Sequence, residues 1–219
     1  GITQDDDLRA PAQRALNQFL ALQEASGGWS ARGRPDTVTT SWAALVLGSA
    51  RDAGLDVPDG AMNRAIAWIH SMADGMGRYG LYRKGDWDDP KQRRNDTATG
   101  AALAALSILD GRNCQRYLRR AAGIVVREAR EGAKVDWEHW YMVSLGLRRL
   151  DDRRGARWDN WCQVVRTEFL ASQTGGHSCA TGSVLGDSGE SRVRVTAFST
   201  LAAGVCASYV NAVGTHSEK

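Results

Sequence analysis

QFLALQ at residues 18–23, followed by GGW at residues 27–29, is the stretch that decides the fold, because it recurs near the other end of the chain. There, EFLASQ at residues 168–173 precedes GGH at residues 175–177. The two closing glutamines are 150 positions apart (173 − 23 = 150), which leaves room for two more units. A repeated helix end followed by a Gly-Gly-aromatic turn is typical of a helical repeat protein.

Two further units occupy that interval. One predicted helix leads into Asp74-Gly75 and Arg78-Tyr79, and another leads into Gly132 and Asp136-Trp137. In each of the four units a second helix follows, rich in Ala, Gly, Ser and Thr. These second helices are predicted over residues 40–53, 97–109, 138–150 and 195–209.

The length of the repeat fits a two-helix unit. Matching Leu45, Leu103, Leu145 and Leu201 gives a mean step of 52 residues, (201 − 45)/3 = 52. The sequence therefore predicts an all-α fold of about four helical hairpins, with larger outer helices and thin inner helices. The expected architecture is an α/α toroid or an open toroid arc. We expect a repeat domain over residues 10–210, between a disordered or tag-derived segment 1–9 and a flexible tail 211–219.

The amino-acid composition argues against some classes of function. The chain is 42% apolar and 24% charged, with a formal net charge of +3, and its arginines are scattered between acids. These values are typical of a soluble globular domain and argue against a nucleic-acid partner. No apolar run approaches the ~20 residues of a membrane span. The cytoplasm is slightly favoured as the compartment, and export is the alternative if a signal peptide was removed upstream of Gly1.

The residues of the first unit resemble a known family. Residues 18–29 resemble the QW repeat of squalene and oxidosqualene cyclases, whose α/α toroid is shared with protein prenyltransferase β subunits. The run 23–68 is similar to bacterial prenyltransferase and squalene oxidase repeat proteins that carry no assigned chemistry. In those proteins a Gly-Gly-Trp turn precedes an Asp-x-x-x-Thr helix start, as Asp36 to Thr40 does here. The resemblance implies that inner helices begin at a central cavity.

The cyclase chemistry that this resemblance implies needs a protonated carboxylic acid in an Asp-x-Asp-Asp-Thr-Ala motif. The corresponding segment here is RRNDTA at residues 93–98, in which Asn95 replaces the proton donor. An amide cannot donate that proton, so we expect no cyclase activity from this motif. Asp96 is predicted to cap a helix N-terminus, and it stays a weak catalytic candidate together with Glu138 and His139.

The prenyltransferase chemistry needs a zinc ion held by Asp, Cys and His. His177, Cys179 and Asp187 offer these residue types, and they are weak candidates because no recognised ligand spacing joins them. We therefore expect no zinc and no other cofactor. The four cysteines contain no CxxC motif and are predicted to be buried free thiols.

The segment DWEHWY at residues 136–141 is the best candidate for a ligand site. Trp137, Trp140 and Tyr141 are expected to form an aromatic wall for an apolar or cationic ligand, with Glu138 and His139 as polar anchors. The alternative is that the aromatic rings belong to the core and that the two polar side chains satisfy each other or the backbone.

Four more residues complete the expected ligand-binding set. They are Asp36 and Thr40 at the first inner helix and Tyr79 and Tyr82 before the second. The two tyrosines open a long aromatic and charged loop, residues 79–94, which is interpreted as a lid, a partner surface or a plug for one end of the ring.

Two functions of different class fit these residues. The first is a non-catalytic binding or interaction module with an apolar, aromatic central cavity, which would take an apolar small molecule or a protein partner. The second is a terpenoid-type enzyme, a cyclase or a prenyltransferase. The missing acids favour the first. Because the family's ring closes with about six hairpins, four should leave two apolar flanks, covered by a homodimer or by further upstream repeats. The first flank includes Leu16, Phe19 and Leu20, and the last includes Phe198 and Leu201.

Overall fold

The computed structural model describes residues 6–31, 33–86, 95–110, 115–130, 135–151, 155–175, 182–184 and 191–214. Over these residues it contains eight α-helices and no β-strand, so the predicted all-α fold is confirmed. The helices are α1 (Asp6–Leu20), α2 (Thr37–Asp52), α3 (Asp59–Ser71), α4 (Asn95–Leu109), α5 (Gln115–Arg130), α6 (Trp137–Leu150), α7 (Ala156–Ser172) and α8 (Arg192–Gly214).

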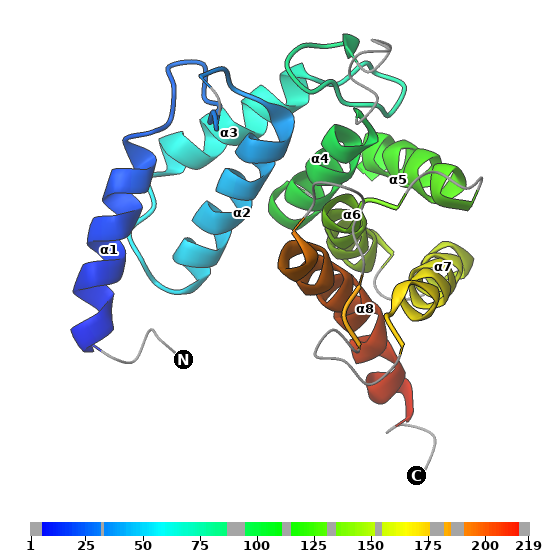
Figure 1. The fold of residues 1–219 in the computed structure, drawn as a ribbon. Coiled ribbons are helices and arrows are strands. Elements are labelled where there is room, and N and C mark those ends of the chain that lie inside the picture. The colour runs from blue at the N-terminus through cyan, green and yellow to red at the C-terminus, as the bar shows by residue number, and fades with distance from the viewer. Residues whose placement is uncertain are drawn as a thin grey trace.

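The even-numbered helices form one layer and the odd-numbered helices lie outside it. Helix α2 packs on α4, α4 on α6 and α6 on α8, while α3 packs on α2, α5 on α4 and α7 on α8. Figure 1 shows α1, α2 and α3 on one side of the molecule and α5 to α8 on the other, with α4 between them. We call α2, α4, α6 and α8 the inner helices.

Small residues let the inner helices approach closely. A Cβ atom on Gly100 of α4 would lie only 2.4 Å from His139 Nδ1 of α6, and one on Gly146 of α6 would lie 2.8 Å from Leu103 Cγ. Real Cβ atoms do not come this close to other heavy atoms, so the backbones of α4 and α6 meet where a side chain is absent. The thin inner helices expected from the sequence thus have a packing role.

The Gly-Gly-Trp turn is fixed to the first inner helix by a threonine. The Trp29 backbone N–H donates to Thr40 Oγ1 (3.0 Å), the Trp29 indole N–H donates to the Phe19 carbonyl (3.2 Å), and the Trp29 and Phe19 rings stack 5.5 Å apart. Gln23 Nε2 donates to the carbonyls of Gly27 (2.9 Å) and Ala61 (3.0 Å). The closing glutamine therefore joins its own turn to α3.

The threonine contact recurs along the chain. The Tyr79 N–H donates to Thr99 Oγ1 (3.2 Å) and the Val184 N–H donates to Thr196 Oγ1 (3.0 Å), as Trp29 does to Thr40. In three of the four hairpins, a threonine near the start of the inner helix thus accepts a hydrogen bond from the preceding turn. Buried backbone N–H groups need such a partner.

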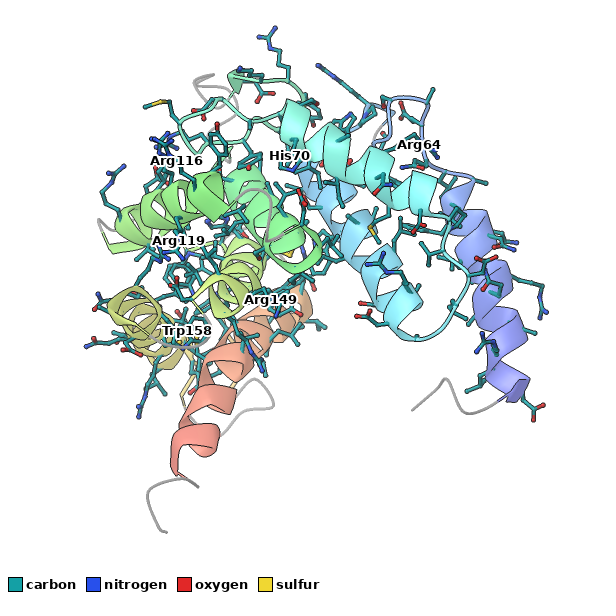
Figure 2. All side chains as sticks on the ribbon, turned by 180° about the vertical axis from the view of Figure 1, so that it is seen from behind. Arg64, His70, Arg116, Arg119, Arg149 and Trp158 are labelled. Atoms are coloured by element: carbon teal, nitrogen blue, oxygen red, sulfur yellow. The ribbon has the colours of Figure 1, made fainter. Side chains whose placement is uncertain are left out.

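Side chains of the outer helices also join neighbouring hairpins. Arg64 of α3, labelled in Figure 2, donates to Gln23 Oε1 (2.7 Å). His70 at the end of α3 lies 2.8 Å from Asp110, just after α4. Trp158 of α7, also labelled in Figure 2, is fully buried in the main core. Adjacent hairpins are thus joined by both polar and apolar contacts.

Two helices extend past the domain boundaries expected from the sequence. Helix α1 begins at Asp6, inside the segment expected to be disordered, because Arg9 donates to the Gly54 carbonyl and Gln13 to the Asp56 carbonyl, which hold its start against the α2–α3 connection. Helix α8 extends to Gly214, into the expected flexible tail. Of the two predicted apolar flanks, the first has Leu16 only 5% exposed with Phe19 and Leu20 half-buried, and the last has Leu201 47% exposed. None of the described helices is both long and apolar enough to span a bilayer.

Candidate functional site

Helix α6 begins where the sequence placed the candidate site. The Asp136 carboxylate accepts the backbone N–H groups of Glu138 (3.1 Å) and His139 (3.2 Å), so it caps the helix and starts it at Trp137. Because successive residues of a helix point about 100° apart, the five candidates that follow cannot share one face. The structure separates them into groups that face different helices.

Trp137 and Trp140 face the outer helix α7. Their ring centroids lie 5.4 Å apart; the Trp137 ring also lies 6.3 Å from Phe169, and the Trp140 ring lies 5.3 Å from Trp161. Trp137 is 6% exposed and Trp140 is 2% exposed. Both residues therefore belong to the main hydrophobic core.

Tyr141 faces the opposite way and meets rings from two other inner helices. Its centroid lies 6.0 Å from that of Trp42 in α2 and 6.1 Å from that of Phe198 in α8, and the Trp42 and Phe198 centroids are 6.2 Å apart. We call these three residues the interior aromatic cluster. Ring centroids about 6 Å apart are in direct contact. The three rings therefore contact one another between α2, α6 and α8, and each of the three residues is half-buried.

Burial within this cluster changes the chemistry of Tyr141. Its side chain is partly removed from water, and the resulting desolvation raises the pKa of the phenol above its ordinary value of 10.0. Tyr141 therefore carries its proton at neutral pH and contributes a neutral ring.

Glu138 is the acid of the interior. Its carboxylate accepts a hydrogen bond from the Trp42 indole N–H (3.0 Å) and forms an ion pair with Arg194 of α8, whose guanidinium carbon lies 5.9 Å from the Phe198 centroid. Two donors, one of them a guanidinium, therefore occupy the carboxylate. Glu138 thus joins three inner helices through its contacts with Trp42 and Arg194.

His139 lies elsewhere. It is 8% exposed and lies against Gly100 of α4, at the point where the two backbones approach. The His139 backbone N–H donates to the Asp136 carboxylate (3.2 Å), whereas the Glu138 carboxylate bonds to Trp42 and Arg194.

The other predicted ligand-binding residues lie outside the interior aromatic cluster. Asp36 is the N-cap of α2 and accepts the backbone N–H of Thr39 (2.8 Å), while Thr40 is fully buried against Trp29. Tyr79 is 1% exposed. Tyr82 lies under the Arg34 guanidinium, whose central carbon is 5.0 Å from the ring centroid. Each of the four residues thus has a structural place in a turn or at the start of a helix.

Several predicted site residues lie wholly or partly outside the described residues. Helix α4 begins at Asn95, so the backbone of Asp96 lies in its first turn and not at the predicted cap position, and the Asp96 side chain is outside the description. His177, Cys179 and Asp187 lie outside it altogether. In the part of the chain that the structure describes, no three His, Cys, Asp or Glu side chains gather as metal ligands would.

A groove that the sequence reasoning missed lies along α8. It has a volume of about 680 Å³, within the range of binding sites. Its lining residues are Ser183, Arg192, Val193, Thr196, Ala197, Thr200 and Leu201. Val193 is 79% exposed and Leu201 is 47% exposed. We call this surface the α8 groove.

A sequence signal for the α8 groove does exist. Val195, Ala202 and Cys206 form the buried face of α8, and Val193, Ala197 and Leu201, at spacing i, i+4 and i+8, form a second face on the same helix. A helix with small or apolar residues on two faces has more apolar surface than its own hairpin covers.

Comparison with known proteins adds no further assignment: the chain matches no family model and no curated protein.

Proposed function

We propose that the chain is a squalene cyclase/prenyltransferase-like repeat domain, arranged as an open toroid arc, that serves as a non-catalytic binding module through the α8 groove. Alternating inner and outer helices, glycine contacts between inner helices and the recurring turn-to-threonine bond support the repeat scaffold. The resemblance of the Gly-Gly-Trp unit to the family's QW repeat supports the family.

The observation that carries the binding role is the contrast between inner helices whose aromatic rings contact one another and a surface whose apolar side chains have no such contact. Trp42, Tyr141 and Phe198 occupy the interior by contacting one another, and Glu138 is held by two donors. The α8 groove, in contrast, leaves apolar side chains exposed.

The shape and charge of the α8 groove favour a protein segment as its occupant. Small-molecule sites enclose most of their ligand, whereas this groove runs along one helix and is open to solvent. An amphipathic helix can place its apolar face in such a groove. Arg192 in the lining adds a positive charge, so the proposed partner carries an acidic residue beside its apolar positions.

Site-specific photo-crosslinking tests this proposal. A benzoylphenylalanine in place of Leu201 should cross-link a discrete protein in the source cells, and the same residue in place of Val46, which is 46% exposed on α2, should not. The identified protein is then purified and its affinity measured directly. We expect Leu201→Glu to weaken binding at least about tenfold and Val46→Glu to change it less than about twofold. Equal labelling at both positions, or an affinity insensitive to Leu201→Glu, would contradict the proposal.

One observation favours the alternative, a terpenoid-type enzyme: three aromatic rings gather beside the Glu138 carboxylate. Such rings can stabilise a cation when they surround one. Incubation with squalene, oxidosqualene or a prenyl diphosphate decides between the two. Product formation that disappears in Glu138→Gln would support the enzyme, and no product above a protein-free control supports the binding module.

A further inference from the structure

Helix α5 carries a row of arginines on its exposed side. Four of the arginines of this helix are exposed, namely Arg116, Arg119, Arg120 and Arg127. Because successive residues of a helix turn by about 100°, the four lie within an arc of about 100° and extend along about 17 Å of the helix. The one acidic residue of α5, Glu128, lies outside that arc and forms an ion pair with Arg78. We call the four arginines the α5 basic face.

The α5 basic face points away from the core. Leu118 and Val125, on the opposite side of α5, are buried in the main core, and the helix packs on α4, α6 and α7. Arg116 and Arg119 are labelled in Figure 2. Within the described part of the chain, no carboxylate forms an ion pair with either of them. Both guanidinium groups can therefore meet an anionic partner.

Two exposed side chains border the α5 basic face. The Asp74 carboxylate accepts three backbone N–H groups of the turn that follows it (2.6, 2.9 and 3.0 Å). Arg120 donates to the Gly75 carbonyl (3.3 Å), so this turn lies against α5. Met76 in the turn is 70% exposed, and Tyr117, one helical turn before Arg120, is 48% exposed. A flexible apolar side chain and an aromatic ring thus lie at the edge of the arginines.

We propose that the α5 basic face, with Met76 and Tyr117 at its edge, docks the protein on the surface of a membrane that contains anionic lipids. Anionic headgroups complement the arginines, each of which strengthens binding near a negatively charged bilayer. A tyrosine ring is favoured at the level of the headgroups, and a methionine side chain can enter beside it. The docking is peripheral, because α5 keeps its own apolar side in the protein core. It does not depend on the function of the α8 groove.

The make-up of the face favours lipid over other anionic partners. A protein interface draws most of its energy from apolar and aromatic anchors near its centre, whereas the centre of this face is Gly123, whose Cβ position meets no atom within 4 Å. Single-stranded nucleic acid is held in a basic groove with aromatic rings on which bases stack. The α5 basic face is instead the convex side of one helix, with Tyr117 only at its edge.

Vesicle co-sedimentation tests the proposal. The probe is vesicles of phosphatidylcholine with about 30% phosphatidylserine, and pure phosphatidylcholine vesicles are the control. We expect binding to the anionic vesicles alone, and we expect about 0.5 M salt to remove most of it, because salt screens the headgroup charge. Arg116→Gln/Arg119→Gln should weaken binding at least about tenfold.

Two matched variants complete the design. Arg14→Gln/Arg51→Gln removes the same charge from exposed arginines of α1 and α2 and should change the affinity less than about twofold. Arg116→Lys/Arg119→Lys keeps the charge and should bind within about threefold of wild type. Thermal unfolding checks that every variant is folded.

Four results would overturn the proposal. They are no binding to the anionic vesicles, equal binding to neutral vesicles, equal weakening by the two glutamine variants, and tighter binding to a short DNA duplex or to polyglutamate than to the anionic vesicles at the same salt concentration. The last result would assign the α5 basic face to nucleic acid or to an acidic protein.

Discussion

The interior aromatic cluster and the α8 groove lie on different faces of α8, and they differ in what occupies them. Phe198 points toward α2 and α6, where its ring contacts those of Trp42 and Tyr141. Val193 and Leu201 point to the groove, where they are exposed. On α8, therefore, the aromatic side chain packs against other inner helices, while the side chains of the groove are small or aliphatic and stay exposed.

The largest effect should come from removing a ring on the core face of α6. Trp140→Ala deletes a side chain that is 2% exposed and contacts Trp137 and Trp161, so we expect it to lower the free energy of unfolding by about 3–5 kcal/mol. Tyr117→Ala, at a residue 48% exposed on α5, should change it by less than about 0.5 kcal/mol. Urea unfolding measures both. Similar losses for both variants would mean that ring burial on α6 is not what stabilises the fold.

Two glycine substitutions should act in opposite directions. Gly100→Ala places a Cβ atom 2.4 Å from His139 Nδ1 and should destabilise the protein by about 1–3 kcal/mol through overpacking. Gly123→Ala on α5 meets no atom within 4 Å and should stabilise it by about 0.5–1 kcal/mol, because alanine is the better helix former. Thermal or urea unfolding of the two variants gives the sign. A stabilising Gly100→Ala would contradict the close approach of α4 and α6.

Glu138→Gln should have a smaller effect. The amide oxygen can still accept the Trp42 indole N–H, while the ion pair with Arg194, whose side chain is 55% exposed, is lost. We expect a loss of about 0.5–1.5 kcal/mol, which shrinks in high salt because salt weakens the wild-type ion pair. A variant more stable than wild type would argue that Glu138 is held under strain, as a catalytic acid can be.

The smallest effect concerns alkaline pH. Since burial raises the folded-state pKa of Tyr141 above the unfolded value near 10.0, its contribution to stability is complete below about pH 10. The contribution is lost as the pH rises through the folded-state value. Tyr141→Phe keeps the ring and should reduce this alkaline loss, as measured by unfolding between about pH 9 and 11. An unchanged pH profile would show that the phenol is not desolvated by the interior aromatic cluster.

The fold was predictable because its signals are local and repeated. Helix periodicity, small-residue inner helices and the Gly-Gly-Trp turn all act within one unit, and the structure is all-helical as expected. The exact alignment of the four repeat units was harder to predict from the sequence. Thr40 and Thr196 stand five residues before Leu45 and Leu201, but Thr99 stands five before Ala104, so the matched position in α4 is Ala104 and not Leu103.

The site was less predictable because it depends on tertiary contacts. Adjacency in DWEHWY suggested one aromatic wall, but helix geometry turns Trp137 and Trp140 away from Tyr141. The partners of Tyr141 are 99 and 57 positions away, at Trp42 and Phe198 (141 − 42 = 99; 198 − 141 = 57). No pattern within one repeat relates residues on three different inner helices, so only the folded chain brings them together.

The most direct test of the α8 groove is a titration with the dye anilinonaphthalene sulfonate. Its fused rings can pack against Val193 and Leu201, and its negative charge can pair with Arg192. We expect one dye to bind per chain. Leu201→Glu should weaken binding at least about tenfold, and Phe198→Leu, on the interior face of the same helix, should change it less than about twofold. Dye binding that survives Leu201→Glu and disappears in Phe198→Leu would place the apolar site in the interior and contradict the account.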